Sequence, residues 1–265
     1  MVWFEKILVF TTLLSGLIWL LDKLFLAKRR AEKAGSDLMD DDAEPWYVDY
    51  AKAFFPVLLI ILCVRSFVVE PFKIPSNSMM PTLLTGDFIF VNKFKYGLRL
   101  PITYKKVISI DEPKRGDVVV FRPPHRPNED WIKRVVGLPG DRIEYKDTVL
   151  SVNGKPMTYQ DLGPYEAFGS GMPVNGWTEM IEHLDGVDHH ILEAPLPPGV
   201  DPGNGSWVVP AGHYFVMGDD RDNSEDTRFW KGQFLSEENL RGKAMRIFFN
   251  WDGGLNSDRF FKSIP

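Results

Sequence analysis

Two serine hydroxyls lie close together in a short segment flanked by prolines. Residues 74–83 read IPSNSMMPTL and place Ser76 and Ser78 two positions apart. Proline fixes its own backbone and restricts the residue before it, so we expect this segment to run extended, outside regular sheet pairing. A serine in such a segment becomes a nucleophile if a neighbouring base removes its proton. A polar linker without chemistry is the alternative interpretation.

Lys133 is the candidate base. In a predicted strand over residues 131–136, Trp131, Lys133 and Val135 share one face, which surrounds the lysine amine with apolar side chains. Burial disfavours the ammonium, and lowering the pKa of a lysine from ~10.4 to about 8 requires roughly 3 kcal/mol of differential destabilisation. A neutral Lys133 could then deprotonate Ser78. The alternative is a lysine at a sheet edge with its amine in water.

Other common catalytic designs are absent from the sequence. No serine lies in G-x-S-x-G or begins S-x-x-K, and no histidines have the H-E-x-x-H spacing of a zinc enzyme. Cys63 is the only cysteine, which excludes an internal disulfide and a cysteine-based zinc site. We expect no metal and no cofactor. We also expect the histidines to lie in loops or at the surface: His125, His183, His189, His190 and His213.

The overall composition averages two different parts of the chain. The 265 residues are 44% hydrophobic and carry a net charge of −5, and the mean hydropathy is −0.16. No basic block is present, which argues against nucleic-acid binding because phosphate contacts need clustered Lys and Arg. The near-neutral hydropathy combines a very apolar N-terminal quarter with a polar remainder.

Two apolar runs predict two membrane-spanning helices. The first covers residues 7–27 and reaches the ~20 residues that a spanning helix needs. A cleavable secretory signal is its alternative, although no A-x-A site follows directly after it. The second run, over residues 53–69, contains Arg65, which we expect near one end with its guanidinium at the headgroups. A buried core helix is the alternative for this run.

Basic residues in the loop between these runs set the expected orientation. Lys28, Arg29, Arg30 and Lys33 follow the first run, whereas the N-terminal tail offers only Lys6, so the loop should be cytoplasmic. The predicted organisation is an N-terminal transmembrane segment at 1–27, a cytoplasmic loop at 28–52 with a mobile linker at 35–50, a second transmembrane segment at 53–70 and an extracytoplasmic domain at 71–265.

The extracytoplasmic domain is predicted to be mainly β, an antiparallel sheet with an inserted small subdomain. Short runs with period-two alternation, separated by Gly, Pro and Asn-Gly, favour strands. Asn153 and Gly154 are expected to form a hairpin turn. Gly- and Pro-rich stretches indicate an irregular insertion at about 146–206. The predicted strands cover residues 87–94, 117–122, 130–138, 141–145, 148–157, 207–219 and 243–250.

Five ordered blocks resemble bacterial signal peptidase I, the membrane-bound Ser/Lys endopeptidase family that removes signal peptides from exported proteins. They are PSNSMMPTL (75–83), GDFIFVNKFKYG (86–97), KRGDVVVF (114–121), IKRVVGLPGD (132–141) and GDDRDNSEDTR (218–228). The resemblance covers both apolar runs and most of the extracytoplasmic domain. It implies a multi-pass protein of a bacterial inner membrane with its catalytic domain on the periplasmic face.

The resemblance also implies a role for each matching polar residue. Ser78 would be the nucleophile and Lys133 the general base. The Ser76 hydroxyl and the Ser78 backbone N–H would form an oxyanion hole, and Ser224 would orient the Lys133 amine. Asp226 and Arg228 would form a supporting ion pair beneath the site.

The expected partners are the signal peptides of exported preproteins and membrane lipid, with no nucleic acid and no metal. The family cleaves after small residues at positions −1 and −3, because shallow apolar pockets exclude bulk. The pocket for position −1 maps to Ile74, Pro75, Met79, Leu83, Trp131 and Ile132, and the pocket for position −3 maps to Phe72, Ile89 and Val120.

Three positions depart from the family pattern. Asn77 stands where many members have Gly, Asp220 where Asn is usual and Thr227 where Ser is common. Asn77 would be strained if the backbone there needed a glycine conformation. A catalytically silent, membrane-anchored envelope protein that binds peptides with the same fold is the alternative function. A self-cleaving Ser/Lys repressor relative is a third, but those proteins are soluble and bind DNA.

Overall fold

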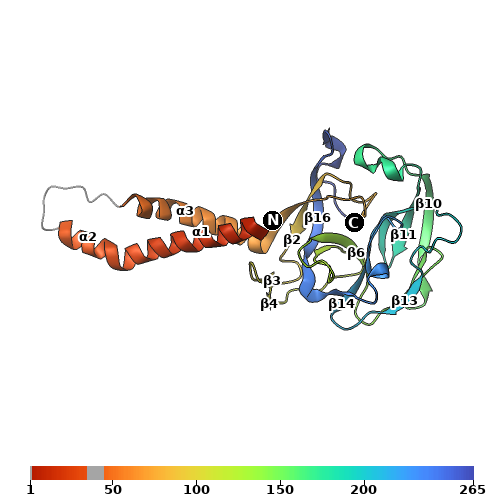
Figure 1. The fold of residues 1–265 in the computed structure, drawn as a ribbon, viewed down its shortest axis with the longest axis horizontal. Coiled ribbons are helices and arrows are strands. Elements are labelled where there is room, and N and C mark those ends of the chain that lie inside the picture. Colours follow the sequence, from red (N-terminus) through yellow and green to blue (C-terminus); the bar gives the residue numbers. More distant parts are fainter. Residues whose placement is uncertain (1, 35–44) are drawn as a thin grey trace. The chain divides into compact units, whose positions relative to one another are not determined.

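Two long apolar helices make up most of the first of two structural units. The computed structural model describes residues 2–34 and 45–265 (Figure 1). Helix α1 (Val2–Leu21) continues through a π-helical turn (Asp22–Leu26) into α2 (Ala27–Ala34), and α3 (Trp46–Cys63) continues through a second π-helical turn (Val64–Val68). Residues 35–44 of the predicted linker lie outside the described residues, and the linker prediction is wrong for residues 46–50, which form the start of α3.

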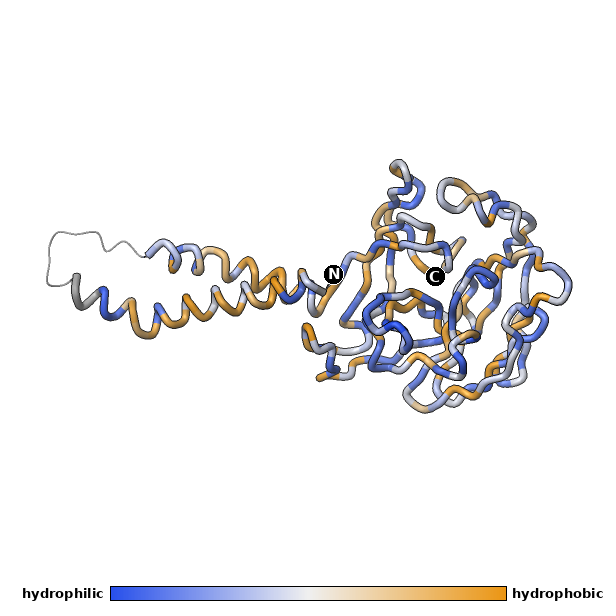
Figure 2. Tube along the Cα trace, viewed as in Figure 1, coloured by the Kyte–Doolittle hydropathy of each residue, from blue (hydrophilic) through white to orange (hydrophobic). Residues whose placement is uncertain are grey.

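Small and aromatic side chains pack α1 against α3. The rings of Trp19 and Phe55 are 5.4 Å apart, and a Cβ atom at Gly16 would lie 2.6 Å from the Phe55 ring. Many apolar side chains of both helices are exposed, and the hydropathy colouring marks most residues of these helices as hydrophobic (Figure 2). Spans over Trp3–Arg30 and Trp46–Val68 are long and apolar enough to cross a membrane.

The second helical segment differs from its predicted bounds. It begins at Trp46 rather than at residue 53, and it ends at Val68 because the next five residues form strand β1 (Val69–Lys73). Arg65 does lie near the end of this segment, where its guanidinium is 4.8 Å from the centre of the Phe4 ring. The first unit also contains Arg99–Val107, which connects β3 (Leu98–Arg99) with β4 (Lys106–Ile108).

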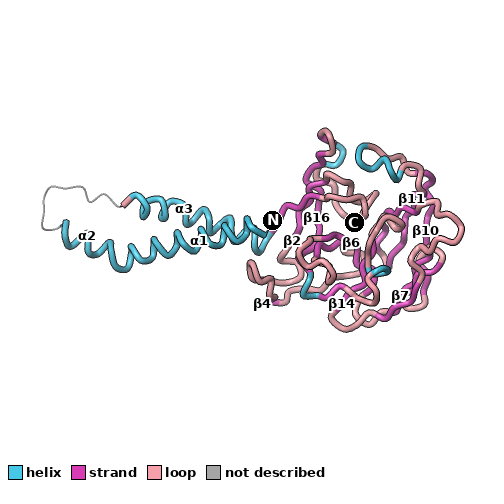
Figure 3. Tube along the Cα trace, viewed as in Figure 1, coloured by secondary structure: helices cyan, strands magenta, loops and turns pink. Residues whose placement is uncertain are grey.

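An eight-stranded antiparallel sheet forms the centre of the second unit, which comprises Val69–Leu98 and Ile108–Pro265 (Figure 3). Its strand order is β1-β2-β16-β5-β6-β14-β15, with β17 paired to β16. The strands after β1 are β2 (Asp87–Asn92), β5 (Val118–Phe121), β6 (Trp131–Gly137), β14 (His213–Met217), β15 (Leu235–Ser236), β16 (Leu240–Trp251) and β17 (Leu255–Asn256).

The insertion is regular rather than irregular, which corrects the prediction. It adds a four-stranded sheet, β13-β7-β8-β9, and a three-stranded sheet, β10-β11-β12. The Gly- and Pro-rich stretches form the loops between these strands. The strands are β7 (Arg142–Lys146), β8 (Val149–Val152), β9 (Lys155–Pro156), β10 (Thr158–Pro164), β11 (Thr178–Leu184), β12 (Val187–Glu193) and β13 (Gly205–Val208). Short 3₁₀ helices are η3 (Gly169–Val174), η4 (Thr227–Phe229), η5 (Glu237–Asn239) and η6 (Ser257–Arg259).

Two local predictions have opposite outcomes. The hairpin turn is confirmed, because Asn153 has φ 53° and Gly154 has φ 79°, the positive values that a two-residue hairpin requires. The single strand predicted over 207–219 is wrong. It is two strands, because a turn closed by a hydrogen bond from the His213 N–H to the Pro210 carbonyl separates β13 from β14.

Candidate active site

The loop between β1 and β2 presents both serines at the surface of the second unit. Backbone hydrogen bonds between Ile74 and Asp87 and between Gly86 and Ile74 close the base of this loop. Its apolar side chains, Met79 and Leu83 among them, point into the core and are fully buried. The loop is therefore anchored by its apolar residues, which leaves the hydroxyls of Ser76 and Ser78 free to face outward.

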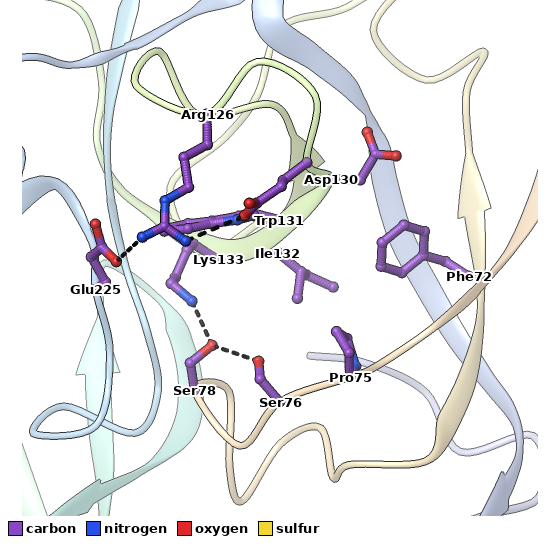
Figure 4. A pocket seen from close by; sticks show the side chains of 11 residues that line it. Phe72, Pro75, Ser76, Ser78, Arg126, Asp130, Trp131, Ile132, Lys133 and Glu225 are labelled. Carbon is purple, nitrogen blue, oxygen red and sulfur yellow. Dashed lines mark hydrogen bonds and ion pairs between the residues drawn. The ribbon is translucent and has the colours of Figure 1, made fainter. Parts of the chain in front are cut away.

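Strand β6 brings Lys133 to the serine loop. The Lys133 Nζ atom donates a 2.5 Å hydrogen bond to the Ser78 Oγ atom (Figure 4). Val119 of β5 pairs with Lys133, and Val135 on the same face of β6 is fully buried. The indole of Trp131 lies 5.7 Å from the amine. The strand register thus gives the lysine the apolar surroundings that its neighbours in the sequence predict.

Burial of the Lys133 side chain lowers the pKa of its amine. Only 4% of Lys133 is exposed, and desolvation lowers its pKa to about 8, although the carboxylates of Asp226, Asp219 and Asp220 oppose this shift. A large fraction of the amine is therefore neutral near pH 8. A neutral amine within hydrogen-bond distance of a serine hydroxyl is an effective general base.

Two hydrogen-bond donors lie beside the Ser78 hydroxyl. The Ser76 Oγ atom is 3.5 Å from the Ser78 Oγ atom. The Ser78 backbone N–H has no hydrogen-bond acceptor within the described part of the chain. A hydroxyl and a free backbone N–H at this position can both donate to an oxyanion that forms on a carbonyl under attack by Ser78.

A loop before η4 lies against the Ser78 backbone. The Asp220 N–H donates to the Ser78 carbonyl at 3.3 Å. A Cβ atom at Gly218 would lie 2.2 Å from the Ser224 Oγ atom and 2.4 Å from the Ser78 carbonyl oxygen, so only glycine allows this approach. The Ser224 hydroxyl is buried and, among the described residues, has no hydrogen-bond partner. The structure therefore places Ser224 beside the Ser78 backbone without a bond to the Lys133 amine.

A buried ion pair fixes this loop. The Arg228 Nε and Nη2 atoms donate to the two Asp226 carboxylate oxygens, each at 2.9 Å. Burial alone would raise the pKa of Asp226, but the Arg228 guanidinium holds it below its usual value. Asp226 also accepts from the Gly218 N–H at 3.0 Å, and Arg228 donates to the Arg221 carbonyl. The pair therefore holds both ends of the Gly218–Arg228 loop together.

A second group of buried charges was not predicted from the sequence. Arg134, next to the candidate base, makes two hydrogen bonds to Asp219, at 2.8 and 2.7 Å. Glu182 of β11 accepts two from Arg221. His189 of β12 is fully buried between these carboxylates, with Nε2 3.2 Å from Glu182 and 3.8 Å from Asp219. The expectation that all histidines lie in loops or at the surface is thus wrong for His189.

Strand alternation contained a signal for these residues. In a half-buried strand every second residue faces inward. Glu182 shares its face with buried Leu184, and His189 shares its face with buried Ile191. The insertion therefore supplies two ionisable groups that brace the loop carrying Asp219.

Ser78 and Lys133 line a cavity of about 490 Å³. Of the predicted pocket residues, Phe72, Pro75, Trp131 and Ile132 line it. The others do not line this cavity but lie in the core beneath it: Ile74, Met79, Leu83, Ile89 and Val120. Charged residues that were not predicted complete the lining: Arg126, Glu129, Asp130 and Glu225.

Asn77 ties the serine loop to its surroundings. Asn77 is not among the described residues with positive φ, so the backbone strain expected at this position does not arise. Its Oδ1 atom accepts from the Thr85 hydroxyl at 2.5 Å, and its Nδ2 atom donates to the Ser170 carbonyl at 3.0 Å. Ser170 in turn donates from its N–H and its hydroxyl to Asp252. A glycine at position 77 could make none of the side-chain contacts.

Thr227 and Asp220, the other two departures from the family pattern, also make structural contacts. The Thr227 hydroxyl accepts from the Val216 N–H at 3.0 Å, a contact that serine could also make. Asp220 is buried and accepts from the Asn223 side chain at 3.1 Å. Burial raises the pKa of Asp220 to about 7. The part of the chain that the structure describes contains no group of three or more His, Cys, Asp or Glu residues that could hold a metal ion.

Comparison with known proteins identifies the family. The family described as Signal peptidase, peptidase S26, matches residues 47–250. Signal peptidase I of Pseudomonas fluorescens is 45% identical over 94% of this chain and 92% of its own length. Signal peptidase I of Pseudomonas aeruginosa is 42% identical, with the same coverage of both chains.

A solved structure, a signal peptidase I from Enterococcus faecalis V583, is 27% identical and covers 51% of this chain and 98% of that chain with a TM-score of 0.31. Identity above 40% with two relatives, along almost the whole of each chain, is sufficient for assignment. The chain therefore belongs to the signal peptidase I family, peptidase S26, whose members are membrane-anchored serine endopeptidases that act on signal peptides.

Proposed function

We propose that this membrane-anchored signal peptidase cleaves exported preproteins with Ser78 as the nucleophile and Lys133 as the general base. The observation that carries the proposal is the 2.5 Å hydrogen bond between a buried lysine amine and a surface serine. Because its pKa is about 8, Lys133 can be neutral under ordinary conditions. No metal or cofactor enters this chemistry.

The reaction follows from the positions of these groups. Neutral Lys133 takes the Ser78 proton as Oγ attacks the carbonyl carbon of the scissile bond. The Ser78 N–H and the Ser76 hydroxyl stabilise the resulting oxyanion. The Lys133 ammonium then gives its proton to the leaving amine, which leaves an ester on Ser78. Water attacks that ester with Lys133 again as base, and the signal peptide is released.

The loop before η4 serves as support in this mechanism. Ser224 would orient the Lys133 amine if its hydroxyl, which has no hydrogen-bond partner among the described residues, turned toward that amine. The Asp226–Arg228 pair maintains the loop that carries Ser224. Each acts through Lys133, so we regard both as positioning groups.

The apolar wall of the cavity accounts for substrate choice. Phe72, Pro75 and Ile132 line one side of the site, and a shallow apolar surface accepts small side chains while excluding bulky ones. Trp131 also lines the cavity, whereas Ile74, Met79, Leu83, Ile89 and Val120 would support the pockets for positions −1 and −3 from the core beneath it. Cleavage after small residues at these two positions is the expected specificity.

The proposed topology has two spans in a bacterial inner membrane. The basic residues after the first span favour a cytoplasmic position for residues 28–52. Both the N-terminus and the catalytic domain would then be on the periplasmic side, with lipid in contact with the spans. In this topology the catalytic domain would meet exported preproteins on the periplasmic side.

Cleavage of a preprotein with an A-x-A site by the detergent-solubilised full chain tests the proposal. Wild type should release the mature protein, whereas Ser78→Ala and Lys133→Ala should each lose more than about 10³-fold in kcat/KM. Lys155→Ala, in the exposed strand β9, is the matched control and should retain wild-type activity. Equal cleavage by all four proteins would refute the dyad. Absence of cleavage by wild type would favour a binding protein without catalysis.

A further inference from the structure

A charged rim forms part of the cavity wall. Arg126 and Glu129 come from the connection between β5 and β6, and Glu225 comes from the loop before η4. All three are about half exposed, at 50%, 52% and 49% for their side chains. Glu225 lies on one side of the Ser78–Lys133 pair and Phe72 on the opposite side (Figure 4).

Contacts within the rim fix its geometry. The Arg126 guanidinium lies 3.5 Å from Glu129 and 3.7 Å from Glu225, and it covers the Trp131 ring at 5.6 Å. The Trp131 indole donates to Glu129 at 2.9 Å. His125 contributes a further contact, with Nε2 3.2 Å from Glu225. The rim is therefore a built surface beside the dyad.

The balance of charge in the rim is negative. Two carboxylates, Glu129 and Glu225, share the single guanidinium of Arg126. A hydrogen bond from Trp131 lowers the pKa of Glu129, which keeps this carboxylate ionised at neutral pH. Asp130, the remaining acid in the lining, is paired with Arg122 at 3.1 Å. The Glu225 carboxylate also acts on the Lys133 amine, so its field reaches the reacting groups.

The direction of the substrate places this rim after the cleaved bond. In the proposed function, on which this inference rests, residues before the bond contact the apolar wall near Phe72 and Ile132. An extended peptide that then crosses Ser78 continues toward the opposite side, where Glu225 lies, and Arg126 stands above the Ser78–Lys133 pair (Figure 4). The first residues of the mature protein would therefore pass the rim.

We propose that the rim, through Glu225 above all, selects substrates by the charge of the first residues after the cleaved bond. Lys or Arg there is favoured and Asp or Glu disfavoured. Arg126 moderates this preference because it neutralises part of the carboxylate charge. For charges this exposed, interaction across a few ångströms corresponds to about a threefold to tenfold change in kcat/KM, and salt weakens it.

Three preproteins that differ only at the second residue after the cleavage site, with Ala, Lys or Glu, test the proposal. The measured quantity is the ratio of kcat/KM for the Lys substrate to that for the Glu substrate, with detergent-solubilised full chain at low salt. Wild type should give a ratio of about three to ten. Glu225→Gln should bring the ratio close to one, Arg126→Gln should increase it, and 0.5 M salt should reduce it in both wild type and Arg126→Gln.

Glu144→Gln is the matched control, because Glu144 is exposed on β7 and does not line the cavity. Its ratio should equal that of wild type. A wild-type ratio near one, or a ratio that Glu225→Gln leaves unchanged, would overturn the charge selection while cleavage of the Ala substrate still supported the peptidase assignment. Failure of wild type to cleave the Ala substrate would instead refute the proposed function.

Discussion

The Lys133 amine and the Ser78 hydroxyl are 2.5 Å apart although 55 positions separate them in the chain. The serine comes from a loop anchored by buried apolar residues, and the lysine comes from the central strand β6. Each of these two elements is held in place by its own contacts, the loop by buried apolar side chains and the strand by pairing within the sheet. The serine hydroxyl therefore lies beside an amine whose pKa is lowered by burial in the sheet.

Gly218 should be required for activity because a larger side chain at this position would not fit. A methyl group there would overlap the Ser224 hydroxyl and the Ser78 carbonyl oxygen, at 2.2 and 2.4 Å. We expect Gly218→Ala to lower kcat by about tenfold or more, since a displacement of even 1 Å is costly for positioned groups. Gly254→Ala is the control, because open space surrounds that glycine and its φ is not positive. Steady-state kinetics with full activity in Gly218→Ala would contradict the close approach.

Asn77 should contribute to the rate by holding the serine loop. Asn77→Gly removes the hydrogen bonds to Thr85 and Ser170, and we expect a loss of about 1–3 kcal/mol in the free energy of unfolding together with a lower kcat. Asn77→Asp retains the acceptor for Thr85 and should be intermediate. A double mutant that combines Thr85→Ala with Asn77→Gly should lose less free energy of unfolding than the sum of the losses in the two single mutants. Exact additivity would mean that the two side chains act independently.

Asp220 should make stability depend on pH near neutrality. Its pKa is about 7 in the folded protein against ~3.9 when unfolded. Between these values the folded state holds more protons, so the free energy of unfolding falls as pH rises from about 4 to 7. Asp220→Asn mimics the protonated carboxyl and should raise Tm at pH 8 more than at pH 4.

Thermal unfolding of the full chain in detergent measures this difference. Glu144→Gln, at an exposed carboxylate, serves as the control and should show no comparable gain. If Asp220→Asn and wild type had equal Tm values at pH 8, the buried carboxyl would not carry the predicted cost.

Much of the fold could be predicted from local patterns. Apolar length predicted two helices, and alternation predicted β2, β5, β6 and β16, because helices and half-buried strands impose these periods directly. The start of α3 was harder to predict from the sequence, because Trp46 and the polar residues after it carry no strong apolar signal. Strand β1 was missed because its apolar residues continue the preceding run.

The candidate site likewise contains some residues that could be predicted from the sequence and others that could not. Ser78 and Lys133 could be found because each stands in a distinctive local sequence. The contacts of Glu225 with Arg126 could not, since they join two loops nearly one hundred positions apart. The pairing of Glu182 with Arg221 likewise depends on how the insertion packs, and only the inward-facing position of Glu182 was available from alternation.

The pH dependence of kcat/KM for an A-x-A preprotein tests directly whether Lys133 is the base, because it reports the ionisation of the free enzyme's base. Only neutral Lys133 can accept the Ser78 proton, so kcat/KM should rise with pH and level off above a pKa of about 8. A rising limb centred near the ~10.4 of an ordinary lysine would contradict the account, because the base would then not be the buried amine beside Ser78.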